Sequence, residues 1–141
     1  MMGARCAGLD VGDKRIGVAV SDGLGLTAQP LSVIERSGTQ SDITKLLASL
    51  ASYDVTRFVA GLPLEMSGRE GEQARRVRVF CDALHARTGI DVVYQDERMT
   101  TRESERILVE SGVTRGKRRK VIDKLAAVLI LQAYLDAHTA R

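Results

Sequence analysis

The sequence predicts a single α/β domain in which helices cover a mixed β-sheet. Two apolar runs, residues 4–11 and 15–21, flank a polar turn at residues 12–15, which is typical of a β-hairpin. Later apolar runs alternate with helical patterns, and strands that are joined through helices pair in parallel. With 141 residues, 44% hydrophobic and 28% charged, the chain is long enough for one domain with a sizeable core.

The first half of the chain continues this pattern. A third strand is expected at residues 28–34, after a glycine-bearing turn at residues 23–25. Ser41 is expected to be the N-cap of a helix, because apolar residues recur after it at helical spacing. Residues 56–61 are expected to form a buried strand and residues 64–71 an exposed loop. The apolar positions of the helix are Ile43, Leu46, Leu47, Leu50 and Ala51.

The second half alternates helices with one further strand. A helix that ends at Gly89 is followed by a strand at residues 90–95. The sequence of residues 100–103 is a capping box, which predicts the start of a helix that ends at Gly112. A basic loop and a final helix over residues 119–137 complete the chain. The apolar stripe of the second helix is Ala74, Val77, Cys81, Leu84 and Thr88, and that of the final helix is Ile122, Leu125, Ala126, Leu129 and Ala133.

Composition excludes several classes of protein. The longest apolar run, residues 125–131, is far too short to span a bilayer, so no membrane partner is expected. The first residues lack the basic and apolar regions of a signal peptide. Cys6 and Cys81 have no spacing typical of a metal site or a redox motif, and we expect both to be small apolar residues of a cytoplasmic protein.

Basic residues are clustered although the net charge is only +3. One cluster lies in the expected loop before the final helix, and a second lies in the second helix. A cluster of this kind is most often a solvated face, but clustered arginine beside a loop also favours a polyanionic partner. The first cluster is Arg115, Lys117, Arg118, Arg119 and Lys120, and the second is Arg75, Arg76 and Arg78.

Acidic residues stand at the places where such a sheet binds ligands, which are the carboxyl ends of its strands. Asp10 lies near the end of the first strand, and Asp96 and Glu97 follow the last strand. Asp123 lies early in the final helix, where the small residues at 126 and 127 would let that helix approach the sheet. The alternatives are that Asp10 is a turn residue and that Asp123 only interacts with the helix dipole.

Carboxylates from separate elements repel one another unless a cation lies between them. Ligand sets made only of oxygen select hard ions such as Mg²⁺ or Mn²⁺. Two such ions, roughly 3.5–4 Å apart, can hold a phosphodiester for hydrolysis. The chain has neither a nucleophile-elbow motif nor a phosphate-binding loop, and His85 and His138 have no catalytic partner in the sequence. The acids therefore favour a two-metal phosphodiesterase.

Four motifs in this order resemble the YqgF/RuvX family, whose members are described as Holliday-junction-resolvase-like and as nucleases of pre-16S rRNA 5′-end maturation. The resemblance covers nearly the whole chain and implies a ribonuclease H-like fold with strand order 3-2-1-4-5 and the first three strands antiparallel. It also implies that Asp10, Glu97 and Asp123 are the catalytic and metal-binding residues. The motifs are GLDVGDKRIGVAVSD from Gly8, GLP at residues 61–63, DERMTT at residues 96–101 and DKLAAVLILQ at residues 123–132.

Within the third motif, Glu97 is preferred to Asp96 because adjacent residues of a strand face opposite ways. The expected contacts to nucleic acid come from basic residues near the acids and from the first basic cluster. Lys14 and Arg15 lie in the turn beside Asp10, where the alternative is a solvated hairpin tip. The complete set is Lys14, Arg15, Arg98, Arg115, Lys117, Arg118, Arg119 and Lys120.

The expected function is that of a metal-dependent endonuclease acting on structured nucleic acid, with pre-16S rRNA as the preferred substrate. The first alternative is a Holliday junction resolvase, which would have to be a homodimer to cut a junction symmetrically. The second is a nucleotide-binding protein of the actin-like type, although 141 residues leave no room for the second domain that such proteins use. The third is a non-catalytic RNA-binding or scaffold protein.

Overall fold

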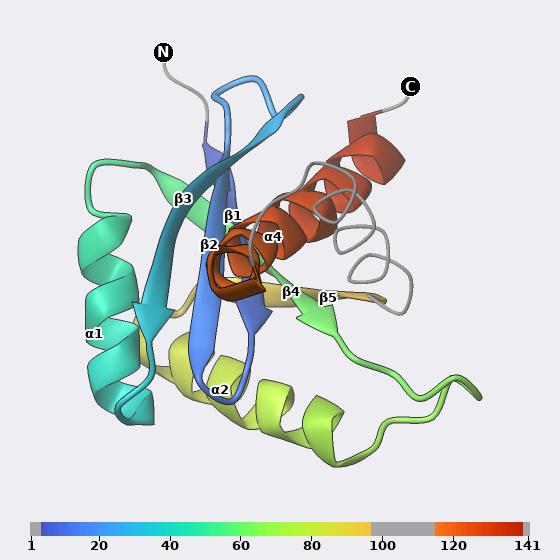
Figure 1. The fold of residues 1–141 in the computed structure, drawn as a ribbon. Coiled ribbons are helices and arrows are strands. Elements are labelled where there is room, and N and C mark those ends of the chain that lie inside the picture. Colours follow the sequence, from blue (N-terminus) through green and yellow to red (C-terminus); the bar gives the residue numbers. More distant parts are fainter. Residues whose placement is uncertain (1–3, 97–114, 140–141) are drawn as a thin grey trace.

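The computed structural model describes residues 4–96 and 115–139, with side chains for residues 4–96 and 125–138. Within these residues the chain forms one five-stranded sheet with helices on both of its faces (Figure 1). The helix expected over residues 100–112 lies outside the described residues.

The sheet has the order β3-β2-β1-β4-β5. Strands β1 and β2 and strands β2 and β3 pair antiparallel, whereas β1 and β4 and strands β4 and β5 pair in parallel. Both the mixed sheet and the order 3-2-1-4-5 predicted from the sequence are therefore confirmed. The strands are β1 (Arg5–Val11), β2 (Arg15–Ser21), β3 (Ala28–Glu35), β4 (Val55–Leu62) and β5 (Asp91–Asp96).

The described helices are divided between the two faces of the sheet. Helices α1 (Thr39–Ser49) and α2 (Glu72–Thr88) cover one face, and α4 (Arg115–Thr139) crosses the other (Figure 1). Helix α2 ends at Gly89, which has a φ of 71° in the left-handed region, as the sequence predicted.

The side chains of β1 alternate between two hydrophobic cores, one on each face of the sheet. Ala7 and Leu9 are fully buried in the core under α1 and α2, with Phe58 of β4 and Phe80 of α2. Cys6, with the opposite parity, contacts the smaller core under α4. Residues of one strand thus divide by parity between the α1–α2 face and the α4 face.

The start of α1 differs from the expectation. Its N-cap is Gly38, and Ser41 lies inside the first turn, where its hydroxyl donates to the Gly38 carbonyl (3.1 Å). Asp42 accepts the backbone N–H of Ser37 (2.9 Å), so an acid of the first turn caps the chain that enters the helix. Asp42 is fully buried, and the Ser41 N-cap prediction is wrong.

Helix α4 begins at Arg115, four residues before the predicted start, so the first basic cluster lies in helix rather than in a loop. Its buried face is also rotated from the predicted one, since Leu125, Leu129 and Ala133 are only half-buried. Helix α4 crosses a sheet, and which stripe faces inward is decided by that contact. The buried residues are Ala126, Ala127, Ile130, Leu131, Tyr134 and Leu135.

The segment after β4 is a largely exposed loop, as the sequence predicted, and its own contacts hold it. Leu64 and Glu70 form an isolated antiparallel bridge, and Glu65 is salt-bridged to Arg69 (3.0 Å).

Cys81 is buried and free, and burial raises the pKa of its thiol to about 12. Cys6 is half-buried and also free, so both cysteines are unpaired thiols, and Cys81 has the buried position that the sequence predicted.

Candidate functional site

The carboxyl ends of β1, β4 and β5 lie at one edge of the sheet, because these three strands are parallel. We call this the carboxyl edge. Helices α1 and α2 begin at the same edge, since they follow β3 and β4, which both run in the direction of β1. Asp10 lies on β1 one residue before its end, and Asp96 is the last residue of β5. The expectation that the two acidic positions share an edge is confirmed.

Asp10 lies on the α4 face of β1. It has the parity of Gly8, and a Cβ atom built on Gly8 would come within 2.7 Å of the Leu131 Cβ atom of α4. Its register partner on β2 is Gly17, which has no side chain to cover the carboxylate. Asp10 is half-buried. A carboxylate in such a glycine-lined position can be approached closely by a ligand.

Helix α4 comes unusually close to β1 at Gly8. The same built Cβ atom would lie only 2.9 Å from the backbone oxygen of Ala127, so no larger residue fits without displacing the helix. Ala126 and Ala127 are both fully buried at this contact. The expectation that small residues let the final helix approach the sheet is confirmed.

Gln132 sets the direction in which α4 crosses the sheet. The Ala28 backbone N–H donates to its Oε1 atom (2.9 Å), and its Nε2 atom donates to the Leu26 carbonyl (2.9 Å). These groups belong to the β2–β3 connection, at the edge opposite the carboxyl edge. Going from Gln132 through Ala127 toward its N-terminus, α4 therefore runs toward the carboxyl edge. Asp123 lies one helical turn, about 6 Å, beyond Ala127 in this direction.

An arginine on the α1–α2 face braces the turn that follows Asp10. The Arg36 Nη1 atom donates to the Gly12 carbonyl (3.1 Å), and its backbone N–H donates to the Lys14 carbonyl (2.9 Å). Its Nε atom is 3.0 Å from the Asp42 carboxylate, and its guanidinium lies 5.1 Å from the Phe80 ring centroid. The β1–β2 turn is thus held from outside the hairpin.

Neither Arg36 nor Asp42 was recognised as part of the site from the sequence. An acid in the first turn of a helix is favoured by the helix dipole, so Asp42 carried no special signal. Burial by itself would raise the pKa of Asp42, but the backbone N–H groups of Ser37 and Gly38 and the Arg36 guanidinium hold that pKa below its ordinary value.

The remaining predicted site residues are only partly described. Asp96 has the parity of Val92 and Tyr94, which pack on the core under α1 and α2. Glu97 and Arg98 lie outside the described residues, and for Asp123 the structure gives the backbone position alone. Among the residues whose side chains are described, no group of three His, Cys, Asp or Glu side chains could hold a metal ion.

The predicted basic residues that the structure describes lie at the β1–β2 turn and at the start of α4. Lys14 is exposed and Arg15 half-buried in the β1–β2 turn and at the start of β2. The first basic cluster occupies the first two turns of α4. The second cluster is paired: Arg75 with Glu72 (2.7 Å), Arg76 with Asp13 (3.2 Å) and Arg78 with Glu70 (2.7 Å).

In the part of the chain that the structure describes, no helix is long and apolar enough to cross a membrane.

The sequence matches the family model described as "RuvX: Holliday junction resolvase" over residues 4–137. A relative from Clostridioides difficile is 53% identical over 136 residues, covering 96% of each chain. One from Symbiobacterium thermophilum is 50% identical and covers 97% of this chain and 95% of its own. Both carry the name "Putative pre-16S rRNA nuclease".

Solved structures share the fold at low sequence identity. RuvC of Thermus thermophilus, in complex with a Holliday junction substrate, aligns with a TM-score of 0.58 at 18% identity and covers 96% of both chains. The fowlpox virus resolvase, in complex with Holliday junction DNA, aligns with a TM-score of 0.59 at 12% identity over 95% of this chain and 98% of its own. These likenesses confirm the predicted ribonuclease H-like fold.

Proposed function

The chain belongs to the RuvX family, and we propose that it is a metal-dependent endonuclease that hydrolyses phosphodiester bonds of structured RNA in the 5′-end maturation of pre-16S rRNA. Relatives about 50% identical over nearly the whole chain carry the name of a nuclease for this RNA. We expect the activity in the cytoplasm, where ribosomal RNA precursors are made in a bacterial cell.

The single observation that carries the proposal is the position of Asp10. Its carboxylate lies on the α4 face of the sheet, one residue before the end of β1, opposite Gly17 and close to the helix that carries Asp123. Burying a carboxylate in part, on a face lined by glycine, is costly unless a cation or a hydrogen-bond donor compensates. A structural turn residue would gain nothing from the surrounding glycines.

We propose that Asp10, Glu97 and Asp123 hold two divalent ions, Mg²⁺ or Mn²⁺. The set is made of carboxylates alone, which suits hard cations and not zinc. When bound, two such ions supply an activated water and stabilise the leaving oxygen. Asp96 has the parity of the opposite face of the sheet, which supports the choice of the next residue, Glu97, as the ligand.

The residues of this chain would also position the substrate. Lys14 and Arg15 lie in the turn after Asp10, and Arg36 holds that turn through the Gly12 and Lys14 carbonyls. We propose that Lys14, Arg15, Arg98 and the first basic cluster contact phosphates on either side of the scissile bond. Contacts of this kind recognise the shape and charge of a nucleic acid and not its base sequence.

The test is cleavage of a transcript that spans the 5′ end of 16S rRNA, with Mg²⁺ or Mn²⁺, by purified wild-type protein and by Asp10→Asn. We expect the variant to lose at least 100-fold in rate, because removing one charged ligand weakens both metal binding and charge stabilisation. The matched control is Asp13→Asn, which removes an exposed carboxylate three residues away and should leave the rate within about twofold.

Equal cleavage by wild type and Asp10→Asn would contradict the proposal, as would an equal loss in the Asp13→Asn control. Mn²⁺ binding by calorimetry adds a readout that does not depend on the choice of RNA. We expect binding by the wild-type protein to be weakened in Asp10→Asn and unchanged in Asp13→Asn.

A second candidate is cleavage of a Holliday junction, which is favoured by the description of the family model and by the fold shared with RuvC. Symmetric cleavage of a four-way junction needs two active sites related by a two-fold axis. Sedimentation with and without a four-way DNA junction measures the oligomeric state, and cleavage assays on the RNA and on the junction measure the substrate. Together they distinguish the two candidates. A monomer that cuts the RNA and not the junction supports the first.

A further inference from the structure

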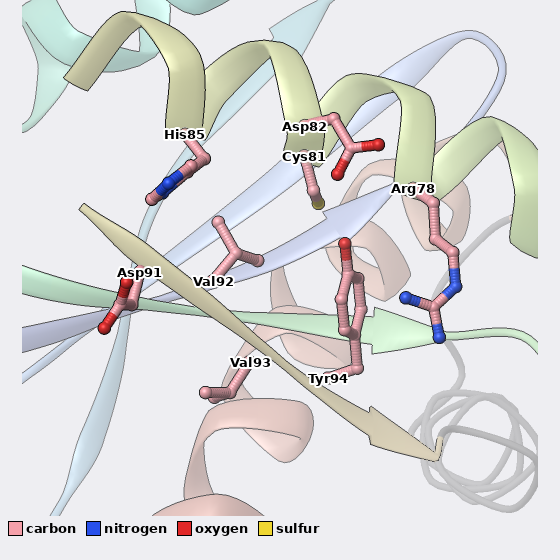
Figure 2. A pocket seen from close by; sticks show the side chains of 8 residues that line it. All are labelled: Arg78, Cys81, Asp82, His85, Asp91, Val92, Val93 and Tyr94. Carbon is pink, nitrogen blue, oxygen red and sulfur yellow. The ribbon is translucent and has the colours of Figure 1, made fainter. Parts of the chain in front are cut away.

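A cavity of about 610 Å³ lies between α2 and the outer edge of β5 (Figure 2). Strand β5 is the last strand in the sheet order, and within the described residues no strand pairs with it on the side away from β4. Among the described lining residues of this cavity there is no carboxylate of the proposed active site. It is lined by Arg78, Cys81, Asp82, His85, Asp91, Val92, Val93 and Tyr94.

The cavity follows the edge of the strand and not one of its faces. Val92 and Tyr94 point toward α2, whereas Asp91 and Val93 point to the opposite side of β5 (Figure 2). Side chains of both parities can line one cavity only if it runs along the strand itself. An edge strand carries outward backbone N–H and C=O groups at alternate residues, which can pair with another strand.

Acidic residues dominate the charge of this cavity. Asp82 on α2 and Asp91 at the start of β5 are both exposed. Within the described residues neither carboxylate forms a hydrogen bond or a salt bridge, and their electrostatic interactions with Arg78 and Arg57 act at longer range. The Arg78 charge is balanced by Glu70, which accepts two hydrogen bonds of 2.7 Å from its guanidinium. The Arg78 guanidinium also lies 4.5 Å from the Tyr94 ring centroid. Two carboxylates therefore remain for an occupant.

Charge argues against two of the three obvious occupants. A nucleic acid would be repelled by Asp82 and Asp91. A second copy of the chain would have to pair β5 with β5, which would bring a second Asp82 and a second Asp91 to the same edge. Carboxylates gathered in this way repel one another.

We propose that the outer edge of β5 binds an extended basic segment of a partner protein as an added strand. Main-chain hydrogen bonds to β5 would supply affinity, and the cavity would select the side chains. Lysine or arginine side chains on the two faces of the added strand would reach Asp82 on the α2 side and Asp91 on the other. The half-buried Val92, Val93 and Tyr94 would be covered by the same segment.

The test uses nuclear magnetic resonance of the full-length, isotope-labelled protein with synthetic peptides. The probe is a capped heptapeptide of alternating threonine and valine with two adjacent lysines at its centre. We expect saturable shifts of the backbone amides of residues 91–96, with Kd below about 1 mM. Replacing both lysines by glutamate should weaken binding at least tenfold, because it removes the charge attraction. N-methylating a valine next to the lysine pair should do the same, because it removes a main-chain hydrogen bond.

Protein variants provide the second arm. Asp82→Asn and Asp91→Asn should each weaken binding of the lysine peptide about fivefold, as expected for one solvent-exposed ion pair. The matched control Asp13→Asn carries the same charge change outside the cavity and should bind as the wild type does. All three variants should keep wild-type nuclease activity.

Three results would overturn the proposal. The first is the absence of shifts at 2 mM lysine peptide, and the second is equal binding of the glutamate peptide. The third is a concentration-dependent shift of residues 91–96 in the protein without peptide, which would identify a second copy of the chain as the occupant.

Discussion

Asp42 shows how one buried side chain can act, through Arg36, on a turn that is distant from it in the sequence. It is fully buried, and its carboxylate accepts from Arg36 and from the backbone of Ser37. Arg36 in turn donates to Gly12 in the turn after Asp10. A buried ion pair contributes little by itself, but removing one partner leaves the other charge uncompensated.

We expect Asp42→Asn to lower the free energy of unfolding by about 2–3 kcal/mol at pH 7, because Arg36 loses its counter-charge. The loss should depend on pH. Since the folded-state pKa of Asp42 lies below its ordinary value, the wild-type carboxylate stabilises the protein fully above about pH 5. This contribution is lost as the pH falls through the ordinary aspartate pKa and then the lower folded-state pKa. Urea unfolding at pH 7 and at pH 3 measures both free energies.

The control for this experiment is Asp54→Asn, at an exposed aspartate. We expect its stability to stay within about 0.5 kcal/mol of the wild type at both pH values. A difference between Asp42→Asn and wild type that is as large at pH 3 as at pH 7 would refute the electrostatic account.

At the scale of one element, α4 is positioned by contacts with β1 and with the β2–β3 connection. Gly8 lets it lie against β1, and Gln132 attaches it to the β2–β3 connection. Together these contacts determine how far its N-terminal turns, with Asp123 and the first basic cluster, extend toward the carboxyl edge. The position of a proposed metal ligand thus depends on a glutamine nine residues away.

We expect Gln132→Ala to expose the Ala28 amide, because its acceptor is the Gln132 Oε1 atom. Amide hydrogen exchange, followed residue by residue, should be at least tenfold faster at Ala28. The Arg36 amide, which donates to the Lys14 carbonyl (2.9 Å) beyond the other end of β3, should keep its exchange rate and is the internal control. An unchanged rate at Ala28 would show that the glutamine does not hold this connection.

At the scale of the whole molecule, the carboxyl edge of the sheet and the outer edge of β5 differ in the charges that they present to a ligand. The carboxyl edge collects Asp10, Lys14 and Arg15, and the first turns of α4 add basic residues. The outer edge of β5 offers carboxylates instead. The net charge of +3 hides this division, since clustered charges of opposite sign cancel in the sum.

We expect substrate binding to depend on salt in proportion to the phosphates contacted. Lys14→Gln and Arg118→Gln should each weaken RNA binding and reduce the slope of log K against log salt concentration by about one. Arg57→Gln removes the same charge at the start of β4, at the opposite edge of the sheet, and should leave the slope unchanged. Filter binding or anisotropy between 50 and 200 mM salt gives the three slopes. A slope that changes equally in all three would refute the proposed path of the nucleic acid.

The parts of the fold that were predicted well are those encoded locally. The hairpin of residues 4–21 is marked by its turn residues and by apolar alternation, and the end of α2 is marked by Gly89. The starts of α1 and α4 were predicted less well. Ser41 and Arg119 are plausible first residues by propensity, but helix ends are set by contacts with the rest of the structure and not by propensity alone.

The sequence by itself determined the family, because motifs are local properties of the chain, and the resemblance to that family implied the order of the strands and the three candidate acids. Only the tertiary structure decided that α4 lies against Gly8, that Arg36 and Asp42 brace the turn after Asp10, and that the edge of β5 carries two unpaired carboxylates. Each of these joins residues far apart in the sequence. The physical reason is that close packing and hydrogen bonding depend on which surfaces meet, and no spacing along the chain records that.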